Sequence, residues 1–224
     1  MSPFKNPFSE VPGVPGVYTS GSTLLTVNAA PGTKVYDEII LEFGGVQYRT
    51  WNAHRSKLAA MILLGGKDFG LDQKSRVLYL GAASGTTPSH VSDILTQGIV
   101  YCVEISQRVF RDLVRVTEAR KNMIPIMGDA SKPIDYAHMV EDVEFVYQDV
   151  AQRNQADMFV RNMQSFEAER GILMLKSRSV DVSKDPKSVY AEVRRHLTAH
   201  NLTVREVIDL DQYAKDHAAF IVEA

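Results

Sequence analysis

The chain has 224 residues, of which 45% are hydrophobic and 23% charged, and its formal net charge at pH 7 is −2. A chain of this length can bury one sizeable core, with room for a small additional module. Non-specific affinity for nucleic acid grows with the number of phosphates that the protein's cations neutralise. A net charge of −2 therefore excludes a protein that binds nucleic acid through its overall charge alone. If nucleic acid is the substrate, we expect other molecules to help deliver it.

The single cysteine, Cys102, excludes an internal disulfide framework. It lies in the apolar run "IVYCVEI", where a buried, unreactive thiol is expected. Prolines and glycines interrupt the first 18 residues where a signal peptide needs an unbroken apolar stretch, and no uncharged apolar run reaches membrane-spanning length. We therefore expect a cytoplasmic protein without a membrane partner.

The first 54 residues read as a small antiparallel β domain. The segments 14–29, 34–43 and 46–52 are short, rich in Val, Tyr, Thr and Ile, and broken by Pro-Gly or Gly-Gly. This pattern is typical of hairpins and meanders. We predict a domain over residues 1–54, followed by a second domain over residues 55–224.

The second domain alternates helices with strands. Residues 56–62 have helical spacing and are followed by Gly65 and Gly66, which predicts a short helix. The following strands are predicted at 76–82, 99–105, 123–130, 143–151 and 171–179. Helices are predicted from residue 87 to Gly98, at 106–121 with Ser106 as cap, at 155–169 and at 185–200. The chain ends in a predicted pair of strands at 203–210 and 217–224. Apolar strands joined by helical crossovers indicate a Rossmann-like α/β fold with a doubly wound, mostly parallel, seven-stranded sheet.

The stretch "GAASGTT", residues 81–87, follows the first of these strands directly. In open parallel sheets the first strand-to-helix turn approaches the ligand most closely. This turn lacks the G-x-G-x-x-G of dinucleotide sites and the Gly-Lys-Ser/Thr of phosphate loops. Gly81 and Gly85 permit a close approach of backbone to ligand, although a tight connection without any ligand would look the same.

Carboxylates end the next three predicted strands. Glu104 stands at an offset from Gly81 that resembles the roughly 20 residues between a Rossmann turn and the acid that binds a ribose diol. Asp129 could accept a hydrogen bond from an adenine amine, and Asp149 ends the fourth strand. Singly, such acids are more often helix caps or solvated loop residues. Together, beside a turn without phosphate-loop features, they favour an adenosyl ligand that carries an amino acid, namely S-adenosylmethionine.

Five motifs resemble the fibrillarin family, over a match from about Val35 to the C-terminus. They are "YRTWNAHRSKLAAMI", "VLYLGAASGTTPSHVSDI", "YQDVAQ", "LMLKSRSVDVSKDP" and "DHAAFIV". The chain has no Arg/Gly-rich segment like that of the eukaryotic members, so the archaeal members are the better match. Ala53 and Pro88 stand where Pro and Val are usual.

The resemblance implies a class I methyltransferase that methylates the ribose 2′-hydroxyl of rRNA and tRNA with S-adenosylmethionine. It implies Thr86 and Thr87 at the methionine end, Glu104 and Ile105 at the ribose and adenine, Asp129 and Ala130 at the base, and Asp149, Val150, Ala151 and Gln152 near the sulfonium. With Gly81, Ala83 and Gly85 of the turn, these residues complete the expected cofactor site. The implied partners are a box C/D guide RNA, a Nop-domain scaffold protein and a kink-turn-binding ribosomal-type protein, and no metal is expected.

The resemblance also implies a catalytic set of Lys57, Asp149, Lys176 and His217. The sulfonium already activates the methyl group, so the enzyme must mainly align the hydroxyl and assist loss of its proton. A lysine with a pKa of about 10.4 is a poor base unless desolvation or a neighbouring ammonium lowers that value. We therefore assign Lys176 to orienting or deprotonating the hydroxyl, Asp149 to holding the lysines, Lys57 to positioning the ribose or phosphate, and His217 to support.

Each of these residues has an ordinary structural interpretation: a solvated lysine at a helix start, a cation at a strand end, a histidine that caps a turn. Two other functions also stay open, a small-molecule O- or N-methyltransferase of the same fold and a non-catalytic ribonucleoprotein scaffold subunit. Candidate phosphate ligands are Arg49, Arg55, Arg153, Arg178, Arg194 and Arg195, although most charged residues only solvate a surface.

Overall fold

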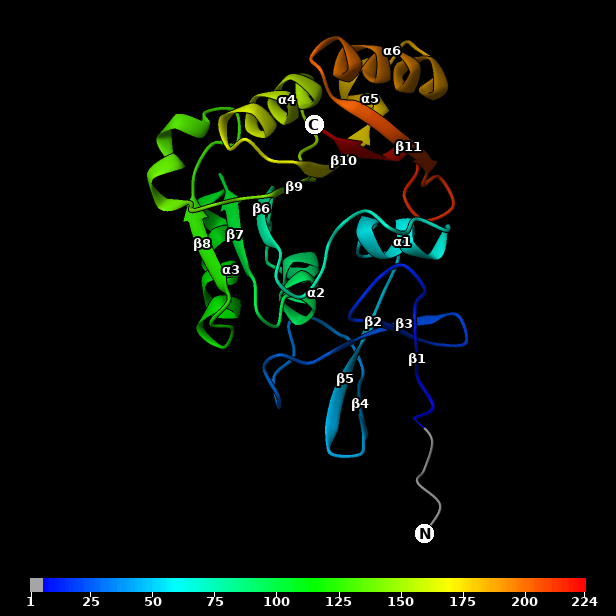
Figure 1. Cartoon of the computed structure of the whole chain (residues 1–224), viewed down its shortest axis with the longest axis vertical. Coiled ribbons are helices and arrows are strands. Elements are labelled where there is room, and N and C mark those ends of the chain that lie inside the picture. The colour runs from blue at the N-terminus through cyan, green and yellow to red at the C-terminus, as the bar shows by residue number, and fades with distance from the viewer. Residues whose placement is uncertain (1–5) are drawn as a thin grey trace.

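The structure is a computed structural model and describes residues 6–224. It contains two sheets, one of five strands and one of seven (Figure 1). The boundary between them falls after Trp51 and before the helix that starts at Lys57. The first five residues of the predicted N-terminal domain lie outside the described residues.

The N-terminal sheet is antiparallel throughout, as predicted. Its strand order is β1-β2-β3-β5-β4. A two-residue loop, Gly44 and Gly45, joins the last two strands, and both glycines have positive φ, as a type I′ hairpin requires. The strands are β1 Ser9–Glu10, β2 Val17–Ser20, β3 Thr23–Val27, β4 Ile40–Phe43 and β5 Val46–Trp51.

The larger sheet has the order β11-β12-β10-β9-β6-β7-β8. Strands β6 to β10 run parallel, and β12 pairs antiparallel with both β10 and β11. The predicted doubly wound, mostly parallel sheet is therefore confirmed. Its strands are β6 Arg76–Leu80, β7 Ile99–Glu104, β8 Met123–Met127, β9 Phe145–Gln148, β10 Arg170–Lys176, β11 Thr203–Asp209 and β12 His217–Glu223.

The helices are α1 Lys57–Leu63, α2 Thr86–Ile94, α3 Gln107–Glu118, α4 Gln155–Ser165, α5 Ser177–Val180 and α6 Pro186–Ala199, with short 3₁₀ turns η1 Pro133–Asp135 and η2 Ala137–Met139. Several predicted strands and helices were too long. The predicted strand at 171–179 ends at Lys176, because the chain turns there into α5. Ser106 takes the N-cap position of α3, as predicted, although its side chain makes no capping hydrogen bond. Helix α2 ends at Ile94 instead of Gly98, whose missing Cβ would lie 2.2 Å from Ser75 O, so Gly98 serves a close backbone contact.

The seven-stranded sheet has an apolar core on each face. Helices α1, α2 and α3 cover one face, together with buried residues of the N-terminal sheet such as Trp51. Helices α4 and α6 cover the other face. Along β6, Val77 and Tyr79 point into the first core and Leu78 and Leu80 into the second, as the period of two in a strand requires. Figure 1 shows the N-terminal sheet below α1 and α2.

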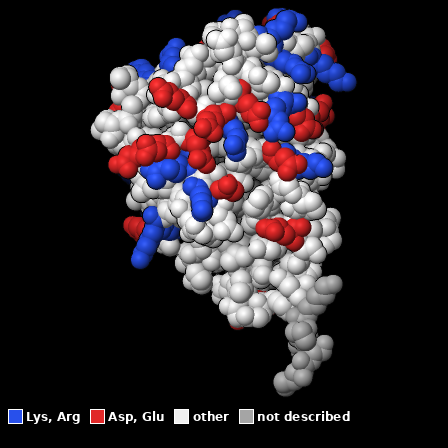
Figure 2. Space-filling model, viewed as in Figure 1, with Lys and Arg blue, Asp and Glu red and all other residues white. Residues whose placement is uncertain are grey.

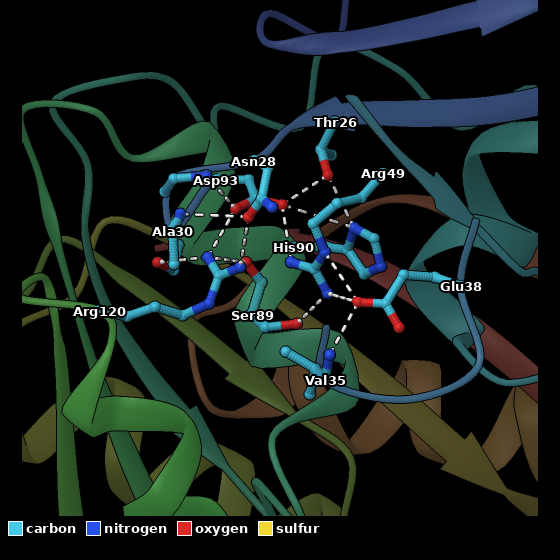
Figure 3. Close-up of polar contacts among 12 residues, drawn as sticks. Thr26, Asn28, Ala30, Val35, Glu38, Arg49, Ser89, His90, Asp93 and Arg120 are labelled. Carbon is cyan, nitrogen blue, oxygen red and sulfur yellow. Dashed lines mark hydrogen bonds and ion pairs between the residues drawn. The ribbon is translucent and has the colours of Figure 1, made fainter. Parts of the chain in front are cut away.

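A buried network of charges joins the N-terminal sheet to α2 (Figure 3). Arg49 of β5 pairs with Glu38 at 2.9 Å and with Asp93 of α2 at 2.8 Å, and Arg120 also pairs with Asp93. Arg49 is 0% exposed. Its expected role as a phosphate ligand was therefore wrong, because a buried guanidinium with two carboxylate partners cannot reach a surface phosphate.

Cys102 is buried and free, as predicted, and burial raises the pKa of its thiol far above the usual value. Within residues 6–224, no helix combines the length and the hydropathy needed to cross a lipid bilayer.

Candidate active site

A cavity of about 220 Å³ opens at the carboxyl ends of β6, β7, β8 and β9. Ligands of open α/β sheets bind at this edge, where successive strand-to-helix turns meet. The lining residues are Gly81, Ala83, Val103, Glu104, Ile105, Gly128, Asp129, Ala130, Asp149, Val150, Ala151, Gln152 and Met158.

The glycine turn is shaped by contacts within the chain. Gly81 has φ +82°, and a Cβ there would lie 2.4 Å from Asp149 O. Gly85 has φ +91°, and its missing Cβ faces Leu113 of α3 at 3.2 Å. Both glycines are thus required by left-handed backbone and close packing. Gly81 also lines the cavity, whereas Gly85 does not.

Glu104 connects two turns of the cavity. One of its carboxylate oxygens accepts from Ala83 N–H at 2.9 Å and the other from Ser106 N–H at 2.8 Å. Each carboxylate oxygen has two lone pairs, so both oxygens keep capacity for a ligand donor. The carboxylate is therefore held rigidly in a place where it can accept from the two hydroxyls of a ribose.

Asp129 stands at the same edge, two residues past the end of β8. Its Oδ1 accepts from the backbone N–H and the hydroxyl of Ser131. These two hydrogen bonds lower the pKa of Asp129 below its usual value, so the group is ionised at neutral pH. Within residues 6–224, its Oδ2 has no hydrogen-bond donor and can accept from an amine.

Lys57 and Asp149 meet across 92 residues of sequence, with the ammonium 2.8 Å from both carboxylate oxygens. Lys57 is the first residue of α1, whose start is capped by Ser56, and Asp149 follows the last residue of β9. Their side chains are 26% and 20% exposed. Because Asp149 also lines the cavity, this pair brings an ammonium group to its rim.

Lys176 and His217 lie side by side at the end of β10 and the start of β12, where they are paired in register. The His217 Nδ1 lies 2.7 Å from Lys215 O, so Nδ1–H donates and Nε2 is left as an acceptor in the neutral ring. The pKa of His217 is lowered, chiefly by burial and further by the ammonium groups of Lys57 and Lys176. All members of the predicted catalytic set thus lie within electrostatic reach of one imidazole.

The structure brings together most of the expected site. The predicted cofactor residues along the cavity are Gly81, Ala83, Glu104, Ile105, Asp129, Ala130, Asp149, Val150, Ala151 and Gln152. Gly85, Thr86 and Thr87 do not line it. Thr87 is buried and donates to Ser56 Oγ at 3.0 Å, which ties the start of α2 to the cap of α1.

Sequence reasoning missed three lining residues, Val103, Gly128 and Met158. Gly128 directly precedes Asp129, so its position at a strand end was a usable signal. Met158 lies on α4 at helical spacing typical of a core residue, and nothing local marks it as part of a cavity. We expected Asp149 to pair with both lysines, but it pairs with Lys57 alone. Among the described residues, Lys176 has no ion pair within 4.0 Å.

The remaining candidate phosphate ligands, Arg55, Arg153, Arg178, Arg194 and Arg195, are exposed. Arg55 pairs with Asp37 and Arg178 with Asp216. Figure 2 shows Lys and Arg interspersed with Asp and Glu over the charged part of this face. The surface therefore offers no continuous basic track on this side for a long polyanion.

The fibrillarin family model matches residues 8–224. The chain belongs to the fibrillarin family. The match begins well before Val35, where the motif resemblance starts, and so it includes the N-terminal sheet. A relative named fibrillarin-like rRNA/tRNA 2′-O-methyltransferase, from Methanothermobacter thermautotrophicus, is 47% identical over 216 residues, or 96% of each chain.

Solved structures of the family have the same fold. Fibrillarin from Aeropyrum pernix, in complex with natively bound S-adenosyl-L-methionine, has a TM-score of 0.87 and 42% identity, over 96% of this chain and 97% of that one. A fibrillarin/Nop5p complex has a TM-score of 0.84 and 39% identity, over 93% of this chain and 97% of the other. The predicted Rossmann-like methyltransferase fold is thereby confirmed.

Proposed function

We propose that this protein transfers a methyl group from S-adenosylmethionine to the 2′-hydroxyl of ribose in rRNA and tRNA. The observation that carries the proposal is the Lys57–Asp149 pair at the rim of the cavity, together with Lys176 and His217, which are paired in register on neighbouring strands. The name and the near full-length identity of the Methanothermobacter thermautotrophicus relative support the same activity.

The residues of the cavity fit S-adenosylmethionine. Glu104 would accept from the ribose hydroxyls and Asp129 from the adenine amine, and Ala130 and Ile105 would pack against the base. The backbone from Asp149 to Gln152 forms the floor on the methionine side. When bound, the cofactor supplies a methyl group that its positively charged sulfur has already activated.

The chain's own residues align and deprotonate the acceptor. The transfer would form an O–CH₃ bond as the S–CH₃ bond breaks, and the hydroxyl proton would have to pass to an unprotonated base, such as a neutral lysine amine. Lys176 orients the hydroxyl or takes its proton, and Lys57, held by Asp149, positions the ribose or its phosphate. His217, neutral at pH 7 because its pKa is lowered, supports this cluster without adding positive charge.

Other molecules bring the RNA to the site. A scaffold with a Nop domain is supported by the fibrillarin/Nop5p complex, whose fibrillarin has the same fold as this chain. A box C/D guide RNA and a kink-turn-binding ribosomal-type protein complete the proposed particle, because a net charge of −2 and mixed surface charges provide little affinity for RNA alone. The free, buried Cys102 is consistent with action in the reducing cytoplasm.

Reconstitution tests the proposal. The protein, a guide RNA, the scaffold and the kink-turn protein are combined with target RNA and labelled S-adenosylmethionine, and the labelled position is mapped. We expect label on one ribose opposite the guide, and almost none when the protein acts alone. Label on a base, or strong methylation by the isolated chain, would overturn the proposal.

Lys176→Ala separates a catalytic subunit from a scaffold subunit. We expect this variant to bind the cofactor and assemble normally while guided methylation is lost. Lys74→Ala is the matched control and should retain full activity. Lys74 is exposed and lies just before the first residue of β6, at the end of the strand away from the cavity. Undiminished methylation by Lys176→Ala would contradict the catalytic role.

A further inference from the structure

Lys176 lies where β10 has outrun its parallel neighbour. Strand β9 pairs with β10 only from Arg170 to Leu173, and its last residue, Gln148, lies opposite Leu173. Lys176, three positions further, has no strand beside it on that side. Without another partner, the N–H and C=O groups of Lys176 would stay unpaired on this side, which is costly for buried peptide groups. The backbone at Lys176 would then also be free to shift.

The side chain of Gln155 fills the missing position. Gln155 is the first residue of α4 and is 0% exposed. Its Oε1 accepts from Lys176 N–H at 2.9 Å, and its Nε2 donates to Lys176 O at 3.0 Å and to Gln152 O at 2.9 Å. Both amide hydrogens are used, and the opposite amide orientation would set donor against donor. The side-chain amide of Gln155 therefore makes the two hydrogen bonds that the backbone of a neighbouring strand would otherwise make with Lys176.

This arrangement also determines how Lys176 faces His217. Both backbone groups of Lys176 are directed at Gln155, while His217 N–H donates to Ala214 O and His217 O accepts from Leu210 N–H. The two residues are thus a non-hydrogen-bonded antiparallel pair, the kind in which side chains lie closer. Gln155 consequently fixes the backbone of Lys176 at the position that is in register with His217.

A second buried amide anchors Gln155 itself. Gln148, the last residue of β9, donates from Nε2 to Gln155 O at 2.6 Å. Gln148 directly precedes Asp149, and Gln152 lies on the cavity floor. These amides tie the cofactor floor, the start of α4 and the end of β10 into one unit.

We infer that Gln155 is a positioning residue, which holds Lys176 at a fixed distance from the cofactor floor so that the ammonium meets the ribose hydroxyl. This inference rests on the proposed function. Gln155 touches neither the cavity nor the reacting atoms, and its effect passes through the backbone of Lys176. A misplacement of about 1 Å at a reacting group can lower a rate about 100-fold.

Gln155→Met tests the inference, because methionine matches the length of the side chain and makes none of the three hydrogen bonds. In the full reconstituted complex we expect the single-turnover rate of methyl transfer, at saturating RNA and cofactor, to fall about 100-fold. The dissociation constant of S-adenosylmethionine, measured on the same protein, should change less than about threefold. A purely structural role would not separate rate from cofactor affinity in this way.

Asn122→Leu is the matched control. The Asn122 amide also donates to two backbone carbonyls, Ser92 O and Leu95 O, and accepts one hydrogen bond, from Ser92 Oγ, but it precedes β8 at the end of the sheet away from the cavity. We expect this variant to lose stability while its transfer rate stays near that of the wild type. Equal losses of rate in the two variants would overturn the inference.

Gln155→Glu is the second variant, since its carboxylate can accept from Lys176 N–H but cannot donate to either carbonyl. Because a buried carboxylate that faces two carbonyl oxygens is costly, this variant should be less stable than the wild type, and it should also transfer slowly; a wild-type rate would overturn the inference. Rapid hydrogen exchange of the Lys176 amide in the wild-type protein would overturn it without any variant. If the wild-type complex fails to label ribose, the proposed function itself fails, which is a separate result.

Discussion

At the scale of single residues, Gly81 shows how the site depends on an absent side chain. Its φ of +82° disfavours any residue with a Cβ, and the space that a Cβ would take is occupied by Asp149 O. The same residue therefore shapes the turn after β6 and the position of the backbone that carries Asp149. Stability and cofactor affinity should depend on it together.

Gly81→Ala should destabilise the protein by more than the approximately 1–2 kcal/mol that left-handed backbone alone costs, because Asp149 must also move. Gly21→Ala is the control: Gly21 has φ +62° but no atom near its missing Cβ, so only the backbone term applies. Urea unfolding and calorimetric titration with S-adenosylmethionine measure both effects. Equal destabilisation by the two substitutions would contradict the steric argument.

At the scale of elements, α2 is held in place by the buried charges of Figure 3. Arg49 of β5 donates to Ser89 Oγ, and Ser89 in turn donates to the carbonyl of Thr86, the first residue of α2. Arg120 binds Asp93 and the carbonyl of Ser89. The helix that follows the glycine turn is thus fixed by residues of the N-terminal sheet and of the segment after α3.

Asp93→Asn should lower the free energy of unfolding by about 3–5 kcal/mol, because it leaves two buried guanidinium groups with Glu38 as their one carboxylate in this network. Asp37→Asn breaks the exposed pair with Arg55 and should cost less than about 1 kcal/mol. Urea unfolding at neutral pH compares the two. A small effect of Asp93→Asn would show that the network is not a stabilising clamp.

At the scale of the whole molecule, the stability of the fold should depend on pH through two histidines. Burial, with Arg49 and Arg120 nearby, holds the pKa of His90 well below its usual value, and the pKa of His217 is also lowered. Because the unfolded chain takes up these protons at higher pH than the folded chain, the stability they contribute is present above about pH 6.5 and is lost on acidification.

The free energy of unfolding should accordingly fall between pH 7.5 and pH 5.5. Urea titrations at several pH values measure this slope. The buried His90 should contribute most of it, since His217 is partly exposed and is screened by solvent. A stability that is constant or rises over this interval would contradict the assignment of lowered pKa values.

The two sheets share one apolar core, and we therefore expect them to unfold as one unit. Trp51 and Leu24 of the N-terminal sheet belong to the same apolar cluster as α1 and β6, and Trp51 stacks on His90 of α2 at 4.7 Å between ring centroids. We predict that a fragment of residues 55–224 loses cooperative unfolding and exposes apolar surface, measured by thermal denaturation and dye binding. A fragment as stable as the whole chain would instead establish residues 1–54 and 55–224 as independent domains.

Local sequence was sufficient for the succession of elements. The composition and glycine breaks of the N-terminal segments, the continuous apolar runs of β6 and β7, and the glycine turn after β6 all depend on neighbours along the chain, so the amino-acid sequence predicts them. The acids Glu104, Asp129 and Asp149 were also found this way, because the carboxyl ends of parallel strands meet at one edge.

Contacts between groups far apart in the chain follow from the three-dimensional fold. The amino-acid sequence was enough to predict the fold class and the chemistry available at the sheet edge, because these follow from local periodicity and from the order of strands. It could not determine that Arg49 is buried while Arg55 is exposed, that Thr87 turns away from the cavity toward Ser56, or that Gln155 binds the backbone of Lys176. Such pairings depend on strand register and on how far one strand outruns its neighbour, and no local pattern encodes either.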